Sequence, residues 1–218
     1  LLRQLGYQVE MPKHLESART LISKGLLKKA QEIAISNVEL LKDQVNEQSP
    51  LVGIEPSAIL SFRDEYLALV PDQLKAAAEK IAANTYTIEE FLCAEMERGA
   101  FSNDLFTEEK RLIRLHGHCH QKAISSVVPT KKLLSLPKNY QVQLIPSGCC
   151  GMAGSFGYEK EHYELSMKIG ELVLFPTIRE AAKEVIIAAP GTSCRHQIMD
   201  GTGRKALHPV EVLWEALK

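Results

Sequence analysis

The 218-residue sequence has no long hydrophobic run and no marked excess of charge of either sign. No segment approaches the roughly 20 consecutive apolar residues that a membrane-spanning helix needs, and nothing at its start resembles a signal peptide. The formal net charge of -1 gives no indication of nucleic-acid binding. We therefore expect a cytoplasmic protein, with any membrane association peripheral, on the cytoplasmic face and made through its partners.

An initiating Met and a dinucleotide-binding fingerprint are also missing. Because the first residues, Leu1 to Tyr7, look like the middle of an amphipathic element, we expect a piece of a longer protein. Without a dinucleotide fingerprint, we expect no FAD or NAD bound to this chain. Any oxidation of a substrate by a flavin would then take place on another domain or subunit.

Apolar residues make up 45% of the chain and charged residues 24%, which is ordinary for a globular protein. Segments rich in β-branched residues alternate with segments of helical period, and this pattern predicts an α/β fold. The expected strands are Gln8 to Met11, Leu51 to Ile54, Leu112 to Leu115, Gln141 to Ile145 and Val185 to Ala189. The expected helices include Leu21 to Leu41, one opened by the capping box Thr87 to Glu90, Tyr158 to Leu172, Thr177 to Lys183, and one from Pro209 through Trp214.

A weak internal repeat divides the chain into two halves. Tyr7-Gln8-Val9 recurs as Tyr140-Gln141-Val142, and each triplet opens an expected strand that ends at a proline. The same shift places Leu15-Glu16-Ser17 against Cys149-Cys150-Gly151, and a helix follows in both places. We therefore expect two related halves, residues 1–108 and 109–218, each a small, mainly parallel sheet flanked by helices.

Four of the five cysteines, Cys119, Cys149, Cys150 and Cys194, lie in three loops of the second half. Each loop directly follows an expected strand. Because ligands gather at the carboxyl ends of parallel strands, we expect these thiols to converge on one metal site. Convergent thiolates suit soft metals, either Zn²⁺ or an iron–sulfur cluster. Cys93 stands apart and is expected to be a buried helix thiol.

The run from Gly148 to Gly157 has a glycine at every third position. Such a backbone can approach an inorganic core closely because no Cβ intervenes. Its amides, and a helix that is expected to begin near Tyr158, would donate to anionic thiolates. A phosphate-binding loop is a weaker interpretation, because no Gly-Lys-Ser/Thr sequence closes the run.

Less specific explanations exist for several of these residues. Cys149 and Cys150 could be coincidental core cysteines or form a redox disulfide, although adjacent cysteines bridge only with backbone strain. One histidine of the alternating triplet His116, His118 and His120 could touch the site, with a hydrogen bond favoured over direct ligation. Residues expected to surround the ligands are His118, His120, Gly151, His196 and Gln197. His162 is expected on a surface helix and His208 at a helix N-terminus, and ion pairs are expected for Glu55, Arg63, Asp64 and Glu65.

The cysteine-containing loops resemble the cysteine-rich CCG domain. This domain occurs in the B subunit of heterodisulfide reductase and in the iron–sulfur subunits of glycolate, lactate and glycerol-3-phosphate dehydrogenases. Most similar is the C-terminal part of a flavin-linked 2-hydroxyacid dehydrogenase fused to an iron–sulfur oxidoreductase. The passages that carry the resemblance are 116–123, 147–159, 193–198 and 208–213, with weaker matches at 23–25, 55–57 and 62–65.

The CCG pattern is one cysteine, a distant cysteine pair, and then Cys-x-x-Cys, which in heterodisulfide reductase holds a noncubane [4Fe-4S] cluster. Cys119, Cys149, Cys150 and Cys194 match this pattern, whereas Gln197 replaces its last cysteine. The cluster implied by the resemblance is therefore a cubane or noncubane [4Fe-4S] cluster, with Zn²⁺ as the alternative. Leu15, Glu16 and Ala58 stand at cysteine positions of the first half, so that half is expected to hold no metal.

The resemblance implies an iron–sulfur electron-transfer domain that serves an FAD-linked dehydrogenase of lactate, glycolate or 2-hydroxyglutarate type. Such a domain is an oxidoreductase component that is not catalytically complete alone. Its expected partners are an FAD-linked dehydrogenase domain or subunit and a ferredoxin-like iron–sulfur module. Two alternatives stay open: a zinc-bound, redox-silent domain that docks the flavoprotein, and a thiol–disulfide enzyme using Cys149 and Cys150.

Overall fold

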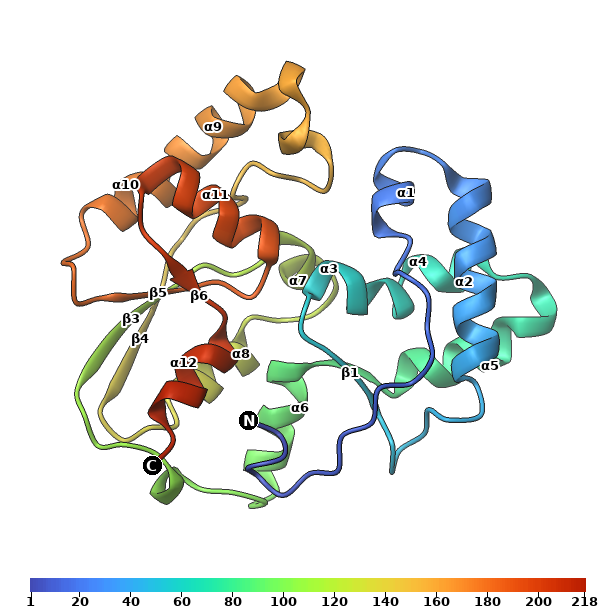
Figure 1. Ribbon diagram of the computed structural model, residues 1–218, viewed down its shortest axis with the longest axis horizontal. Coiled ribbons are helices and arrows are strands. Elements are labelled where there is room, and N and C mark those ends of the chain that lie inside the picture. Colours follow the sequence, from blue (N-terminus) through green and yellow to red (C-terminus); the bar gives the residue numbers. More distant parts are fainter.

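The computed structural model describes all residues from 1 to 218 and contains two small parallel sheets flanked by helices (Figure 1). The larger sheet has the strand order β4-β3-β5-β6, and the smaller one pairs β1 with β2. The α/β class with two small parallel sheets is therefore confirmed. The strands are β1 Leu51–Gly53, β2 Thr85–Thr87, β3 Arg111–Leu115, β4 Tyr140–Leu144, β5 Ile186–Ala188 and β6 Ala206–Leu207.

Twelve α-helices surround the sheets. Those before the larger sheet are α1 Arg19–Ser23, α2 Leu27–Leu41, α3 Pro56–Ile59, α4 Glu65–Leu69, α5 Asp72–Ala83 and α6 Ile88–Glu97. Those that follow β3 are α7 Cys119–Ile124, α8 Val128–Leu134, α9 Tyr163–Glu171, α10 Leu174–Arg179, α11 Thr192–Thr202 and α12 Pro209–Ala216. No helix combines the length and the apolar character that crossing a membrane requires.

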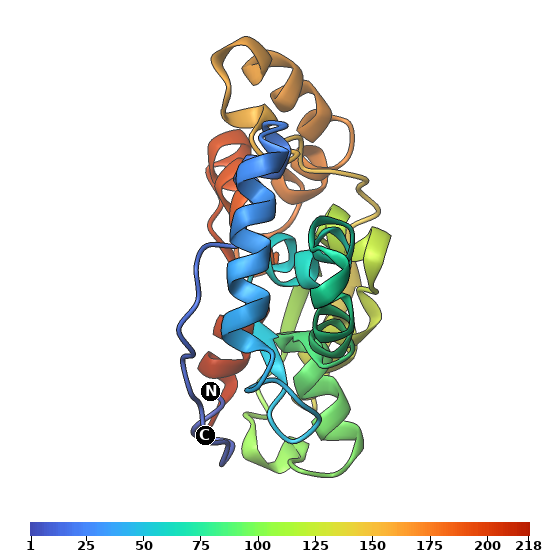
Figure 2. The same ribbon diagram turned by 90° about the vertical axis from the view of Figure 1, so that its right-hand side faces the viewer.

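Helices cover both faces of the larger sheet, because alternate strand residues point to opposite sides. Ile113 and Ala188 enter a core shared with α6, α8 and α12. Ile187 enters a second core on the other face, formed with α10 and α11. Leu1 and Leu217 both pack against the first core, so the two chain ends lie at the same side of the molecule (Figure 2). The helix α6 thus joins the first half of the sequence to the core of the second.

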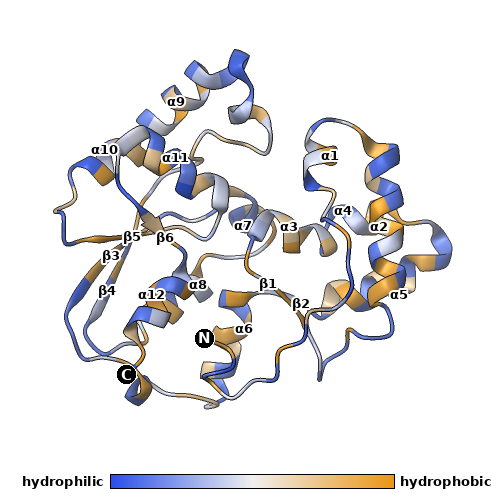
Figure 3. Ribbon diagram, viewed as in Figure 1, coloured by the Kyte–Doolittle hydropathy of each residue, from blue (hydrophilic) through white to orange (hydrophobic).

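The first half has its own core between α2, α4 and α5, and apolar and polar residues alternate along these helices (Figure 3). The single helix expected from Leu21 to Leu41 is wrong, because the chain breaks between α1 and α2. Gly25 takes a φ of +70° there, and the amide of Leu26 donates to the carbonyl of Leu21. A left-handed glycine ends the first helix in this way.

The strand expected at Gln8 to Met11 is also wrong, since this segment has no regular structure and Met11 is 84% exposed. No neighbouring strand offers it a hydrogen-bond ladder. The other four expected strands are present within two residues of their expected limits. The capping box of α6 is present as expected, with Thr87 and Glu90 exchanging hydrogen bonds.

Two helix limits in the second half differ from expectation. The segment expected to be helical from Tyr158 begins with two 3₁₀ turns, Phe156–Tyr158 and Lys160–His162, and α9 starts only at Tyr163. The helix expected at Thr177 to Lys183 is α10, which starts at Leu174, so that Pro176 lies in its first turn where its missing N–H costs nothing.

Candidate metal centre

Three neighbouring strands of the larger sheet deliver the four cysteines to one edge. Cys119 opens α7 shortly after β3, Cys149 and Cys150 lie in the loop after β4, and Cys194 is in the first turn of α11 after β5. These strands are adjacent and parallel, so their carboxyl ends lie side by side. The structure thus brings together the loops that the sequence placed at one edge.

The four thiols form one connected cluster. The thiols influence one another in sequence, Cys119 with Cys149, Cys149 with Cys150, and Cys150 with Cys194. All are free thiols, and Cys150 and Cys194 are only 3% and 1% exposed. Cys93 lies elsewhere, buried on α6 with its Sγ 3.8 Å from Oε1 of Glu97, as expected for a structural thiol.

Their surroundings favour charge on alternate sulfurs. Hydrogen bonds from the Cys119 and Cys150 thiols hold the pKa of Cys149 below its ordinary value. The thiol of Cys150, followed by the nearby ring of His116, lowers the pKa of Cys194 despite its burial. The amide of Gly151 adds a donor 3.3 Å from Sγ of Cys149. Since the thiolate is the form that binds metal, Cys149 and Cys194 are prepared for ligation, whereas the pKa values of Cys119 and Cys150 are raised by the neighbouring thiols and by burial.

His116 is the histidine of the triplet that reaches the cluster. It is 0% exposed, and one ring nitrogen and the Sγ atoms of Cys150 and Cys194 all lie within 4.8 Å of one another. Its Nδ1 is 2.7 Å from Oγ of Ser147, whereas its Nε2 has no hydrogen-bond partner. The sequence indicated that one histidine of the triplet could touch the site, but the set expected around the ligands omitted this one.

The other two histidines of the triplet lie at the start of α7. His118 is the N-cap of α7 and packs so closely on Gly191 that a Cβ there would lie 2.4 Å from its ring. His120 lies within α7, so the three histidines do not alternate along an extended segment. Burial, followed by the charge of Arg19, lowers the pKa of His120, so this ring faces the first half.

Gln197 and His196 do not point at the sulfurs. The Nε2 of Gln197 donates to the carbonyl and to the hydroxyl of Ser166 on α9, at 3.2 and 2.9 Å. Gly151, with a φ of +106°, lies against the same pair, and a Cβ on it would be 2.1 Å from the Ser166 carbonyl oxygen. His196 is exposed and lies 3.5 Å from the hydroxyl of Tyr158. Gln197, which stands where the CCG pattern has a cysteine, therefore bonds to α9 next to Gly151 and does not contact the sulfurs.

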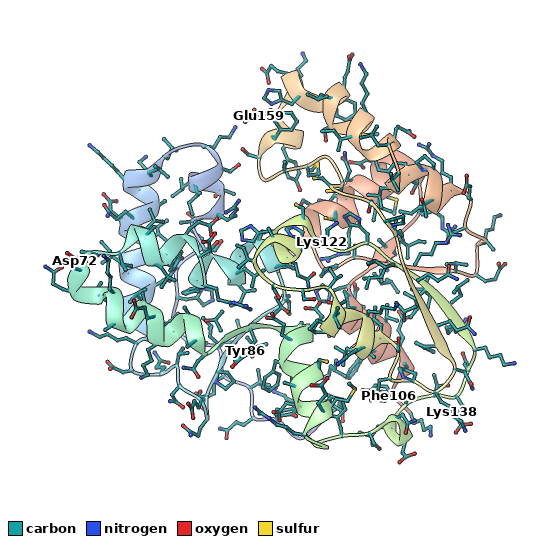
Figure 4. All side chains as sticks on the ribbon, turned by 180° about the vertical axis from the view of Figure 1, so that it is seen from behind. Asp72, Tyr86, Phe106, Lys122, Lys138 and Glu159 are labelled. Atoms are coloured by element: carbon teal, nitrogen blue, oxygen red, sulfur yellow. The ribbon has the colours of Figure 1, made fainter.

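The loop after β4 is also held by the side chain of Lys122 and by residues at the end of α1. Lys122, labelled in Figure 4, donates to the carbonyls of Ser147 and Gly148, each at 2.7 Å. On the other side, Lys24 pairs with Glu159, which Figure 4 also labels, and the amide of Ser155 donates to the hydroxyl of Ser23. These contacts fix the glycine-rich run between α7 and α1.

Glu55 links the two halves as a helix cap, whereas an ion pair was expected. It accepts from Ser57 at the start of α3 and, through Oε2 at 2.8 Å, from the amide of Thr192 at the start of α11. Although burial raises its pKa, these donors lower it overall. The expected ion pairs do form at Arg63 with Glu90 and at Glu65 with Arg19.

Two remaining histidines fit their expected places. His208 is the N-cap of α12, where its Nδ1 accepts from the amide of Val210 and its Nε2 lies 2.9 Å from the carbonyl of Ile54. His162 is partly exposed just before α9 and stacks on Phe156. Neither ring belongs to the cluster of thiols.

Comparison with known proteins shows that the chain is similar in sequence to parts of dehydrogenases. It is 26% identical over 219 residues to D-2-hydroxyglutarate dehydrogenase of Escherichia coli K12, covering 100% of this chain and 20% of that protein. It is 28% identical over 198 residues to the C subunit of the anaerobic glycerol-3-phosphate dehydrogenase of the same organism, with 90% of this chain and 48% of that relative aligned. A D-2-hydroxyglutarate dehydrogenase of Pseudomonas putida is 27% identical over 215 residues, or 98% of this chain and 20% of its own length.

The chain therefore spans between one fifth and one half of the length of these relatives. No model of a known protein family matches it. No solved structure matches it either. The chain is thus similar to one region of larger oxidoreductases. This agrees with the expectation of an oxidoreductase component.

Proposed function

We propose that this chain is an iron–sulfur electron-transfer domain of an FAD-linked 2-hydroxyacid dehydrogenase. One observation carries the proposal: four free thiols from three strand ends form a single, largely buried cluster. Such a set of cysteines is what holds [4Fe-4S] clusters in proteins. Residues 109–218 would contain the site, and residues 1–108 would support it without a metal of their own.

The residues fit such a group in their chemistry. The donors are soft thiolates, which iron–sulfur clusters and zinc prefer. The buried Nε2 of His116 lacks a partner beside them, although buried polar atoms are normally satisfied. Cys119, Cys149, Cys150 and Cys194 would hold the cluster, and when bound it would supply one-electron transfer.

The protein around the sulfurs would set the properties of the bound group. The amide of Gly151 donates to Cys149, and Lys122 holds the carbonyls of the loop in place. Hydrogen bonds to cluster ligands and burial both tune a reduction potential. The first half covers the loop through α1, so it limits access of water and small oxidants to one side of the site.

Oxidation of the hydroxy acid would take place on a partner. D-2-hydroxyglutarate dehydrogenases match the whole of this chain with a fifth of their length. This coverage supports an FAD-linked dehydrogenase domain on the same polypeptide or a separate subunit. A ferredoxin-like iron–sulfur module is the second proposed partner. We place the domain in the cytoplasm, with any membrane contact made through these partners.

A bound zinc ion is the second candidate, and one observation favours it. The donor atoms of His116, Cys150 and Cys194 lie within 4.8 Å of one another, a spacing that suits a single tetrahedral ion with bonds of about 2.0–2.3 Å. A zinc-bound domain would be redox-silent and would act by docking the flavoprotein. A thiol–disulfide enzyme that uses Cys149 and Cys150 is less well supported, because such chemistry needs accessible thiols and Cys150 is buried.

Anaerobic purification followed by iron, sulfide and zinc analysis tests the proposal. The wild-type protein should be brown and contain iron with matching sulfide, whereas zinc alone would give a colourless protein. Cys149→Ser and Cys150→Ser should each abolish metal retention. Cys93→Ser is the matched control, because it removes a buried thiol outside the cluster. Equal retention in all three variants would reject the assigned ligands.

A further inference from the structure

One buried nitrogen next to the thiols has no partner within the protein. His116 follows β3 directly, and its amide donates to the carbonyl of Ala188 on β5, so its backbone is part of the sheet. The side chain is completely buried, and Nε2 makes no hydrogen bond. An unsatisfied buried polar atom costs about 1–3 kcal/mol. This cost is avoided if a metal occupies the space between the ring and the sulfurs.

The other ring nitrogen is positioned as in a metal-bound histidine. Nδ1 lies 2.7 Å from Oγ of Ser147, and no other side chain contacts that hydroxyl by a hydrogen bond. A histidine that binds metal through one nitrogen commonly donates its other N–H to a neighbouring acceptor, which fixes the tautomer. With the proton on Nδ1 and directed to Ser147, Nε2 carries the lone pair, and we infer that it is the ring nitrogen that lies within 4.8 Å of the Sγ atoms of Cys150 and Cys194.

We propose that His116 is a direct ligand of the bound metal, through Nε2, as the fifth donor of this site. The inference rests on the proposed function, because it assumes that the thiols hold a metal. Gln197 cannot fill the role of the missing fifth cysteine, since its amide group is engaged with Ser166. His116 instead reaches the sulfurs from the carboxyl end of β3 and brings the donor count to four thiolates and one imidazole.

Neither neighbouring histidine offers the same arrangement. His118 is in van der Waals contact with Gly191 and is not among the donor atoms that lie within 4.8 Å of one another. His120 faces Arg19 and Glu65 of the first half. Of the three histidines, His116 is therefore the one placed to bind the metal, and Ser147 is the residue that positions its ring.

A neutral imidazole has a measurable consequence for the site. Where histidine replaces cysteine on iron, the reduction potential rises, because one negative charge is removed from the cluster. His116→Cys should restore that charge and shift the midpoint potential to a more negative value. His162→Gln, a control at a partly exposed histidine outside the cluster, should leave the potential unchanged.

The direct test uses the complete 218-residue chain, purified anaerobically after growth with ¹⁵N-histidine and reduced with dithionite. Pulsed electron paramagnetic resonance should show a strong hyperfine coupling from one directly bonded nitrogen. The same coupling should persist in His118→Gln and disappear in His116→Cys. Only weak couplings in the wild type would show that His116 merely donates a hydrogen bond to sulfur, and this would overturn the inference.

The variants keep the two proposals separable. Ser147→Ala should weaken metal retention by about 10–100-fold, the usual effect of removing the partner that orients a ligand, and unchanged retention would count against the inference. If the wild type contains no iron or sulfide, the proposed function fails. If it contains zinc instead, X-ray absorption at the zinc edge tests the ligand, and the absence of a nitrogen neighbour at about 2.0–2.1 Å would contradict it.

Discussion

Two loops of this molecule each contain a residue with a positive φ but are held in different ways. In the first half, Ala18 has a φ of +59° just before α1, and in the second half Gly151 has a φ of +106° after the cysteine pair. The first loop is fixed by Asn37, which accepts from the amide of Leu15 and donates to the carbonyl of Glu16. The second is lined by thiols and by an imidazole with a free nitrogen.

The comparison shows how a loop without thiols is held by protein hydrogen bonds alone. Asn37 also donates to Tyr66, whose hydroxyl reaches the carbonyl of Ser17, so protein hydrogen bonds close the first loop completely. Both side chains are fully buried.

Gly151→Ala should have the largest effect. A Cβ at this position would lie 2.1 Å from the carbonyl oxygen of Ser166, and its positive φ is unfavourable for alanine. Forced overpacking with backbone strain should lower the free energy of unfolding by about 3 kcal/mol or more and abolish metal retention. Urea unfolding and metal analysis measure both. Normal metal content and stability would show that the loop is not as tightly packed as described.

Glu89→Gln tests the contact between the halves. Glu89 is 0% exposed at the start of α6, its carboxylate lacks a hydrogen bond, and His208 lies 3.6 Å away. Burial raises the pKa of Glu89 from 4.5 to about 7. The folded state therefore holds its proton more tightly than the unfolded state, and stability falls as the pH rises from 4.5 to about 7, then levels off.

Removing this charge should stabilise the protein at pH 8, by up to about 3 kcal/mol, and change little at pH 4.5. Urea unfolding across this pH range measures the difference between Glu89→Gln and the wild type. Glu79→Gln, on the exposed side of α5, is the control and should follow the wild type. A constant difference between Glu89→Gln and the wild type at all pH values would contradict the assignment.

Asn37→Ala should destabilise the first loop and leave the metal content unchanged. It removes three buried hydrogen bonds, each worth about 1 kcal/mol, so the free energy of unfolding should fall by about 3 kcal/mol. Iron content should stay at the wild-type level. Gln44→Ala, which removes one exposed hydrogen bond, serves as the control. Loss of iron in Asn37→Ala alone would show that the first loop takes part in the site.

Ala18→Gly should have the smallest effect. Glycine relieves the left-handed strain of alanine, worth about 1–2 kcal/mol, but loses about 0.5–1 kcal/mol to its greater freedom when unfolded. The net change in the free energy of unfolding should be a gain within about 1 kcal/mol, measured by urea denaturation. A clear loss of stability would mean that the Cβ of Ala18 makes packing contacts that outweigh the strain.

Sequence patterns predicted the parts of this fold in which local signals agree with tertiary contacts. The apolar, β-branched runs at β3 and β5 lie at the centre of the larger sheet, and the capping box of α6 forms as expected. The convergence of the cysteine loops followed from their places after parallel strands. The strand expected at Gln8 to Met11 failed because alternation alone supplies no neighbouring strand.

Other features depend on contacts that no short pattern contains. Gly25 interrupts a continuous apolar stripe, and the stripe itself gives no sign of the break. The selection of His116 from the triplet depends on Ser147, a residue of another loop. The role of Gln197 depends likewise on Ser166 of α9. The short strands β2 and β6 form only because a neighbouring strand is already in place.

Counting metal and sulfide in the anaerobically purified wild-type protein, beside Cys194→Ala, tests the central claim most directly. The account predicts one [4Fe-4S] cluster, about four irons and four sulfides per chain, and none in the variant, because the first half binds no metal. A protein that holds one zinc ion without sulfide, or a variant that keeps its iron, would contradict it.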